Sequence, residues 1–149
     1  MKASQMFAHW KQVHADSLAT LAKFSDAELA FTPFPGSWPA GKIALHIFDT
    51  EDYWLRYVAR GEGTEPPDAE LKDYPTVAAI TEFSNQVHTG TESYLESLDL
   101  SDLERSLALP GSRSTSLGWI IWHVLEHEIH HRGELSLILG ILGREGLDV

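Results

Sequence analysis

The segment His127-Glu128-Ile129-His130-His131 places two imidazoles four residues apart, within a stretch that has the apolar composition of a long helix. Residues i and i+4 of an α-helix lie one turn apart on the same face, so His127 and His131 can direct their ring nitrogens at one point. Two ligands of a transition-metal ion need this arrangement. The spacing therefore predicts that His127 and His131 bind a divalent metal ion.

The same helix indicates which way the two rings point. At about 100° per residue, Ile120 and Ile138 fall on nearly the same line as the histidine pair, so the pair is expected to interrupt the core-facing apolar stripe. A buried polar group without a hydrogen bond costs on the order of 1–3 kcal/mol, so both rings need partners. The alternative to a metal ion is packing in the core against a carbonyl or carboxylate of a neighbouring helix. His130 is expected at the rim or surface, and the direction of His123 stays open.

A metal ion held by protein needs at least a third ligand from another part of the chain. His46 is the best-placed candidate, because it lies near the start of another predicted helix on a face that mixes apolar and polar residues. Facing helices are where bundles build metal sites. His9, His14 and His88 are weaker candidates, expected at the surface or packed in the core.

Apolar residues recur at helical spacing in four stretches, which predict helices over residues 4–24, 42–60, 76–98 and 116–142. No convincing strand pattern accompanies them. The expected fold is all-α, a four-helix bundle formed by residues 1–149 as one domain.

The connections between these helices predict their order in space. Residues 61–75 form a proline-, glycine- and acid-rich connection long enough to cross the length of a bundle, which leaves room for a parallel pair and an up-down-down-up order. Residues 32–41 and 112–116 are expected to be loops. Ser25–Glu28 and Ser101–Glu104 have the pattern of capping boxes that open short helical turns.

Composition excludes several classes of function. The formal net charge of -11 and the lack of any Lys/Arg cluster argue against a nucleic-acid partner. No apolar run approaches the roughly 18–20 residues of a membrane span, and residues 1–10 lack the apolar segment of a secretory signal, so a cytoplasmic protein without a membrane partner is expected. The chain has no cysteine, which excludes disulfides and thiolate ligands.

Three neutral imidazoles leave open positions on a metal ion, which is typical of a catalytic centre. Such a position activates water, whose pKa falls toward about 7, or deprotonates a thiol. Glu128 and Glu134 are the candidate catalytic carboxylates, as bases or as acceptors for a ligand N–H; the alternative is that they are solvated. His-Glu-x-x-His is also the pattern of a zinc protease, but no further histidine motif follows it and a helical bundle has no sheet edge to align a peptide.

The run Trp122–Leu135, taken with Trp38 and His46, resembles the DinB/YfiT-like superfamily. The usual signature there is a histidine in the second helix and His-x-x-x-His-Arg-Gly-Gln in the fourth. The resemblance extends from the first helix to Gly143, and it implies a four-helix bundle with a long second connection.

Carried over position by position, the metal-binding histidines of that family fall on His46, His127 and His131. The resemblance implies zinc or nickel as the metal and a homodimer as the assembly. One departure is Glu134, which stands where glutamine is commoner and could add negative charge near the ion.

Family members of known activity resemble thiol transferases, which activate bacillithiol, mycothiol or glutathione and add it to an electrophile or use it to isomerise one. The resemblance thus implies a metal-dependent transferase with a small-molecule substrate and a low-molecular-weight thiol as co-substrate. Three alternatives stay open: a hydrolase that uses metal-bound water, a non-catalytic metal-binding stress-response protein, and a purely structural bundle with packed histidines.

Overall fold

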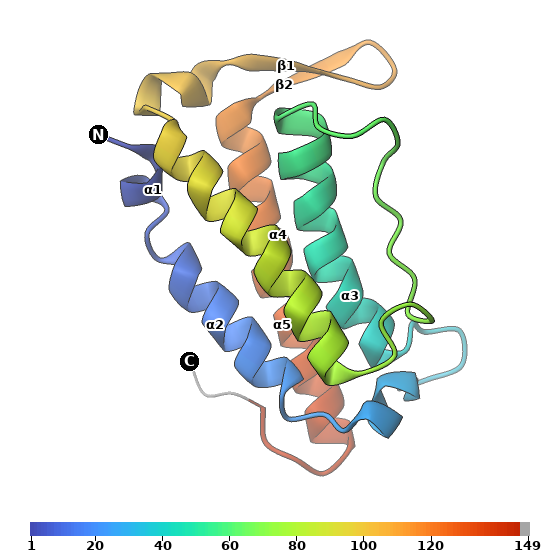
Figure 1. The fold of residues 1–149 in the computed structure, drawn as a ribbon. Helices are drawn as coiled ribbons and strands as arrows, with labels where there is room; N and C mark the ends of the chain where they lie inside the picture. Colours follow the sequence, from blue (N-terminus) through green and yellow to red (C-terminus); the bar gives the residue numbers. More distant parts are fainter. Residues whose placement is uncertain (147–149) are drawn as a thin grey trace.

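Four long helices pack side by side in the computed structural model, which describes residues 1–146 (Figure 1). Their bounds are α2 (Trp10–Leu21), α3 (Ala40–Glu51), α4 (Val77–Ser97) and α5 (Leu117–Ile141). The wider π-helical segment η2 (Asp52–Ala59) extends α3 without a break. The predicted all-α, four-helix bundle is confirmed. Among the described residues, no helix has both the length and the apolar character needed to cross a membrane.

The helix directions match the predicted up-down-down-up order. In Figure 1, α2 and α5 run downward, while α3 and α4 run upward and are therefore parallel. The connection over residues 60–76 makes this possible, because it returns along the outside of the bundle to the start of α4. Helix α5 contacts both α2 and α3, and α4 contacts the same two helices from the other side.

The N-terminal helix predicted over residues 4–24 is wrong in its first part, because a separate turn α1 (Ala3–Met6) precedes α2. The Ala3 N–H donates to the Leu98 carbonyl at 3.0 Å, and Lys2 pairs with Asp99 in a short antiparallel bridge. These contacts hold α1 against the end of α4. Tertiary contacts thus override a helical periodicity that runs on without interruption in the sequence.

The prediction of no strand, and of a loop over residues 112–116, is also wrong. Strands β1 (Ser106–Leu109) and β2 (Arg113–Ser116) form an antiparallel hairpin across one end of the bundle (Figure 1). The chain reverses at Gly111 (φ 76°) and Ser112 (φ 57°), which adopt the left-handed conformation that a tight turn needs. Each strand has four residues, too few for an alternating pattern to stand out.

Two short 3-10 helices occupy the positions of the predicted capping boxes. Segment η1 (Asp26–Ala30) begins at the box that Ser25 and Glu28 form, as predicted. Segment η3 (Leu100–Glu104) begins at a box formed by Asp99 and Asp102, so the pattern at residues 101–104 was placed two residues too late. Asp99 is a good N-cap because its carboxylate accepts backbone N–H groups as a serine hydroxyl does.

The core consists of two apolar clusters, one near the hairpin and one at the opposite end of the bundle. Between them, each long helix buries at least one polar or charged side chain. The ionisable members of this central layer are His14 on α2, Glu51 on α3, His88 on α4 and Glu128 on α5. A layer of this kind is unusual, because charged side chains are rarely buried unless they are paired.

Candidate metal centre

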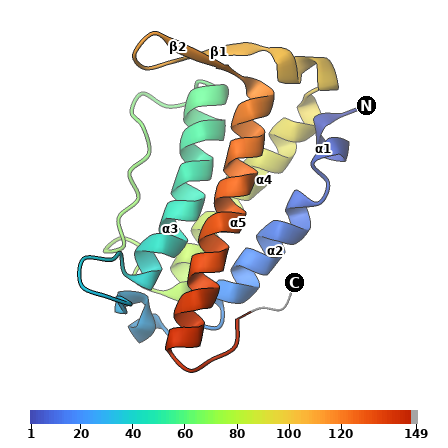
Figure 2. The same ribbon diagram turned by 180° about the vertical axis from the view of Figure 1, so that it is seen from behind.

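His46, His127 and His131 meet where α3 packs against α5. These two helices lie side by side and run in opposite directions (Figure 2). One ligand atom from each of the three side chains lies within 4.8 Å of the others. Nε2 of His127 is 3.1 Å from Nε2 of His46, and the ring centroids of His127 and His131 are 4.3 Å apart. The structure therefore brings together the three histidines that the sequence singled out.

The local structure explains the position of His46. Pro39 stands just before the first turn of α3, with a φ of -68° that leads into the helix, and His46 follows two turns later. The indole ring of Trp38 contacts His46 edge to face, with ring centroids 5.0 Å apart. The segment before α3 thus packs against the ring of His46.

The three histidines are partly buried, with the side chain of His131 15% exposed, so the pair on α5 points toward the interior without being fully buried in the core. Burial, together with the nearby rings of His131 and His46, lowers the pKa of His127 to about 3. Burial and the charge of His131 also hold the pKa of His46 below its usual value. Both rings are therefore neutral near pH 7, which is the form that coordinates a metal. Nδ1 of His127 is buried and has no hydrogen-bond partner among the described atoms.

Glu134 orients one of the three rings. Nδ1 of His131 donates a hydrogen bond of 2.6 Å to Oε2 of Glu134, one turn further along α5. With the proton on Nδ1, the lone pair of His131 lies on Nε2. A carboxylate that fixes the tautomer and direction of a histidine in this way is the usual companion of a metal ligand.

Glu128 lies on a different side of α5, and the structure does not bring it to the three histidines. Its Oε2 accepts a 2.7 Å hydrogen bond from the indole N–H of Trp10, and its side chain is almost fully buried. Burial alone would raise its pKa, but the contacts with His14 and Trp10 hold the pKa of Glu128 below its usual range. A step of one residue turns a helical side chain by about 100°, which separates Glu128 from His127.

The other histidines have distinct surroundings. His130 is exposed, as predicted, and His9 is exposed as well. His123 is half-buried and stacks on the indole of Trp119, with ring centroids 4.7 Å apart. His14 and His88 lie in the buried central layer.

In that layer, one ligand atom each from His14, Glu51 and His88 lies within 4.8 Å of the others. Burial favours neutral His88, but the hydrogen bond and charge of Glu51 outweigh it and raise the pKa of His88. The sequence prediction missed Glu51 altogether, because three helices contribute one side chain each and no short motif joins them. In the sequence Glu51 lies in the acidic run Asp49-Thr50-Glu51-Asp52, which gives no sign that this carboxylate is buried.

An apolar cavity of about 470 Å³ is lined by one of the three histidines, His131. Glu134 and Ser37 are its other polar lining residues. The apolar side chains that line the rest come from the segment before α3 and from α3 and α5: Pro33, Phe34, Trp38, Ile43, Leu137, Ile138 and Ile141. A concave apolar site with a few convergent polar groups is typical of a small-molecule pocket.

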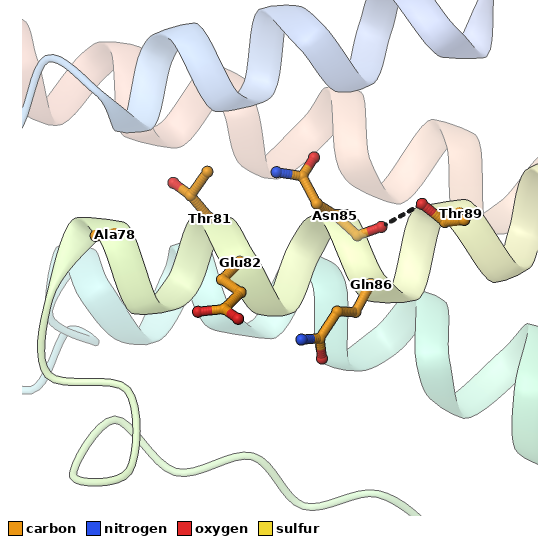
Figure 3. Close-up of a pocket in the computed structure, with 6 residues that line it drawn as sticks. All are labelled: Ala78, Thr81, Glu82, Asn85, Gln86 and Thr89. Atoms are coloured by element: carbon orange, nitrogen blue, oxygen red, sulfur yellow. Dashed lines mark hydrogen bonds between the residues drawn. The ribbon is translucent and has the colours of Figure 1, made fainter.

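A surface depression on the outer face of α4 has a different lining from this cavity (Figure 3). Glu82 is its one ionisable side chain, and the Thr89 hydroxyl donates to the Asn85 carbonyl at 2.8 Å within the same helix. No set of metal ligands or bases converges there, so the depression offers no chemistry comparable to that of the histidines.

The fold and the site define a class: a four-helix bundle with parallel second and third helices and a candidate trihistidine metal centre between α3 and α5. Comparison with protein families agrees, since the family model of the DinB superfamily matches residues 9–135. This match covers most of the sequence. The protein belongs to the DinB superfamily.

Individual relatives are distant. The YizA protein of Bacillus subtilis (strain 168) is 28% identical over 95 residues, which span 62% of this chain and 58% of YizA. The crystal structure of a DinB-like protein from Bacillus cereus ATCC 10987 has a TM-score of 0.78 at 23% identity and covers 96% of this chain and 94% of that one. The mycothiol-dependent maleylpyruvate isomerase has a TM-score of 0.62 at 10% identity, covering 88% of this chain and 60% of that one. Both structural likenesses show a shared fold.

Proposed function

We propose that this protein is a metal-dependent enzyme that acts on a small-molecule substrate with a low-molecular-weight thiol as co-substrate. In the proposal, His46, His127 and His131 bind a divalent ion, zinc or nickel. The observation that supports it most strongly is the convergence of three half-buried imidazoles from two helices beside an apolar cavity. Two of these rings have lowered pKa values and present neutral nitrogens, so the donor set fits such an ion.

A divalent ion bound there would lower the pKa of a thiol or water molecule that reaches it. The protein contributes the surroundings. Glu134 holds His131 with its Nε2 lone pair available, and Trp38 packs against His46. Imidazole ligands carry no negative charge, so they would not weaken the acidity of a bound thiol. The apolar cavity next to His131 would bind the apolar part of an electrophile and keep bulk water away from it.

One further observation favours a thiol as the co-substrate: a structural neighbour with the same fold is a mycothiol-dependent isomerase. The chain has no cysteine, so such a thiol would come from outside the protein. The glutamate at position 134 would serve as a proton acceptor in the same reaction, because it adjoins both the cavity and His131.

The test is thiol consumption by protein loaded with zinc or nickel and supplied with mycothiol, bacillithiol or glutathione and a chromogenic electrophile. We expect turnover that requires metal, that is lost in His127→Ala and that persists in His9→Ala, which removes an exposed histidine. Equal rates in wild type and His127→Ala would contradict the proposal. Turnover without any thiol would instead support the hydrolase, and metal-dependent stabilisation without turnover would support the non-catalytic protein.

The proposal extends to a homodimer formed through α5. Trp122, Ile129 and Leu137 are exposed large apolar side chains on this helix, and at about 100° per residue they fall on one side of it. Exposed apolar patches on a folded domain mark interaction surfaces. Light scattering after gel filtration should give twice the chain mass for wild type and less for Ile129→Glu.

A further inference from the structure

The buried centre of the bundle contains a second group of potential metal ligands, which the proposed thiol chemistry does not use. His14 on α2, Glu51 on α3 and His88 on α4 each offer one ligand atom, and these atoms lie within 4.8 Å of one another. Nδ1 of His88 is 3.0 Å from Oε1 of Glu51. From the fourth helix, Oε1 of Glu128 lies 3.6 Å from Nδ1 of His14. All four long helices thus contribute one such side chain.

Each of these four side chains has a buried atom that lacks a hydrogen-bond partner among the described residues. The atoms are Nδ1 of His14, Oε2 of Glu51, Nε2 of His88 and Oε1 of Glu128. The side chains are at most 8% exposed, so bulk water does not satisfy these atoms. In folded proteins nearly all buried polar side-chain atoms are paired, and one left unpaired is strongly unfavourable. Two of the four, Nδ1 of His14 and Oε1 of Glu128, face each other at 3.6 Å, whereas Oε2 of Glu51 and Nε2 of His88 face no such group. These unpaired atoms in one layer indicate that a ligand belongs there.

The charges in this layer indicate a cation. Two carboxylates, Glu51 and Glu128, carry two negative charges in a region that excludes water, and such charges are stable only when they are compensated. Protonation of both imidazoles would compensate them, but the rings of His14 and His88 are stacked with centroids 3.9 Å apart. Two stacked cations repel each other at that distance. One divalent ion balances both carboxylates and leaves both rings neutral.

We propose that the centre of the bundle is a second divalent-metal site, distinct from the three histidines between α3 and α5. Its ligands are His14, Glu51 and His88, and Glu128 supplies the second negative charge. Imidazole and carboxylate donors without sulfur suit first-row ions such as Zn²⁺, Mn²⁺, Fe²⁺ or Co²⁺. Because the two rings are parallel, one of them tilts when both coordinate the same ion. The ion would join helices that the Trp10–Glu128 and His88–Glu51 hydrogen bonds already link at this level.

Two surface depressions give an ion access to this layer. One, between α1 and α2 on one side and α4 on the other, reaches His88 and carries Glu92 and Glu96 at its edge. The other lies between η2 and α4 and reaches Glu51. Basic side chains also line these depressions: Lys11, which pairs with Glu92 at 3.6 Å, in the first, and Arg56 and Arg60 in the second. The formal net charge of -11 favours the approach of cations to the protein as a whole.

The test uses a variant that lacks the outer site, His127→Ala/His131→Ala, and titrates it with Co²⁺, whose visible absorption reports nitrogen and oxygen ligands. We expect this variant to bind about one Co²⁺ per chain and the wild type about two. Adding Glu51→Gln, a nearly isosteric change, or His88→Asn should abolish the remaining binding. Adding His9→Ala should leave it unchanged.

No Co²⁺ bound by the variant without the outer site would overturn the proposal, as would binding that Glu51→Gln leaves unaltered. This test does not depend on the folding of the core variants, because the double variant retains the whole interior. It is also independent of thiol consumption. Failure of the inner site would therefore be distinguishable from failure of the outer one.

Discussion

Replacing Glu134 tests whether the outer histidines are metal ligands or packed side chains. The charged hydrogen bond of 2.6 Å between Glu134 and His131 holds the Nε2 lone pair in place. Loss of a partner of this kind weakens metal affinity about 10–100-fold, which corresponds to about 1.4–2.8 kcal/mol. In Glu134→Gln the amide oxygen still accepts the bond without charge, so we expect about a tenfold loss. In Glu134→Leu the bond is gone, and we expect about a hundredfold loss.

The assay is competition for Zn²⁺ or Ni²⁺ against a chromogenic chelator at pH 7.5. The Kd of each Glu134 variant is compared with that of Glu126→Gln, which removes an exposed carboxylate from the same helix. We expect the control to match the wild type within about twofold. Equal Kd values for Glu134→Leu and the control would refute the reasoning, because His131 would then bind no ion or need no orientation.

Four further substitutions test the stability of the fold. Trp10→Phe removes the indole that donates to buried Glu128, so chemical denaturation should show a loss of about 2–4 kcal/mol, and a loss below 0.5 kcal/mol would contradict the hydrogen bond. Gly41→Ala places a Cβ about 2.9 Å from a leucine side chain and should destabilise the protein by about 1–3 kcal/mol. In Gly133→Ala the new Cβ has no atom within 4 Å, and the substitution in the middle of α5 should stabilise the protein by about 0.5–1 kcal/mol. A higher melting temperature for Gly41→Ala than for Gly133→Ala would contradict the packing. Burial raises the pKa of Asp49, so its charged form destabilises the fold above that pKa. Asp49→Asn should therefore raise the melting temperature at pH 7 and have little effect below pH 3.8, and an equal gain at both pH values would argue against this account.

Local spacing predicted the outer site because two of its histidines are neighbours on one helix. His127 and His131 share a face of α5 in any packing, and His46 followed from the expectation that the second and last long helices face each other. What spacing did not provide was the rotation of α5 in the bundle. The structure turns Glu128 fully inward and leaves the histidine pair half-buried, although apolar residues flank both.

Local sequence patterns could not predict the inner cluster or the hairpin, for two different reasons. His14, Glu51 and His88 come from three helices, so their meeting depends on the three-dimensional arrangement alone. The hairpin strands are short, and their pairing depends on a turn at Gly111 that the sequence also allows in a loop. Helices α3 and α4 were predicted well because their apolar residues recur at helical spacing, and α5 because its long stretch is strongly apolar in composition.

The most direct measurement is an anomalous difference map from crystals of untagged protein, collected on both sides of the zinc and nickel absorption edges. The account predicts a peak between α3 and α5, within about 2.0–2.3 Å of nitrogens from His46, His127 and His131. The account would be contradicted by a map that shows no anomalous peak there and shows each of these nitrogens hydrogen-bonded to another group of the protein.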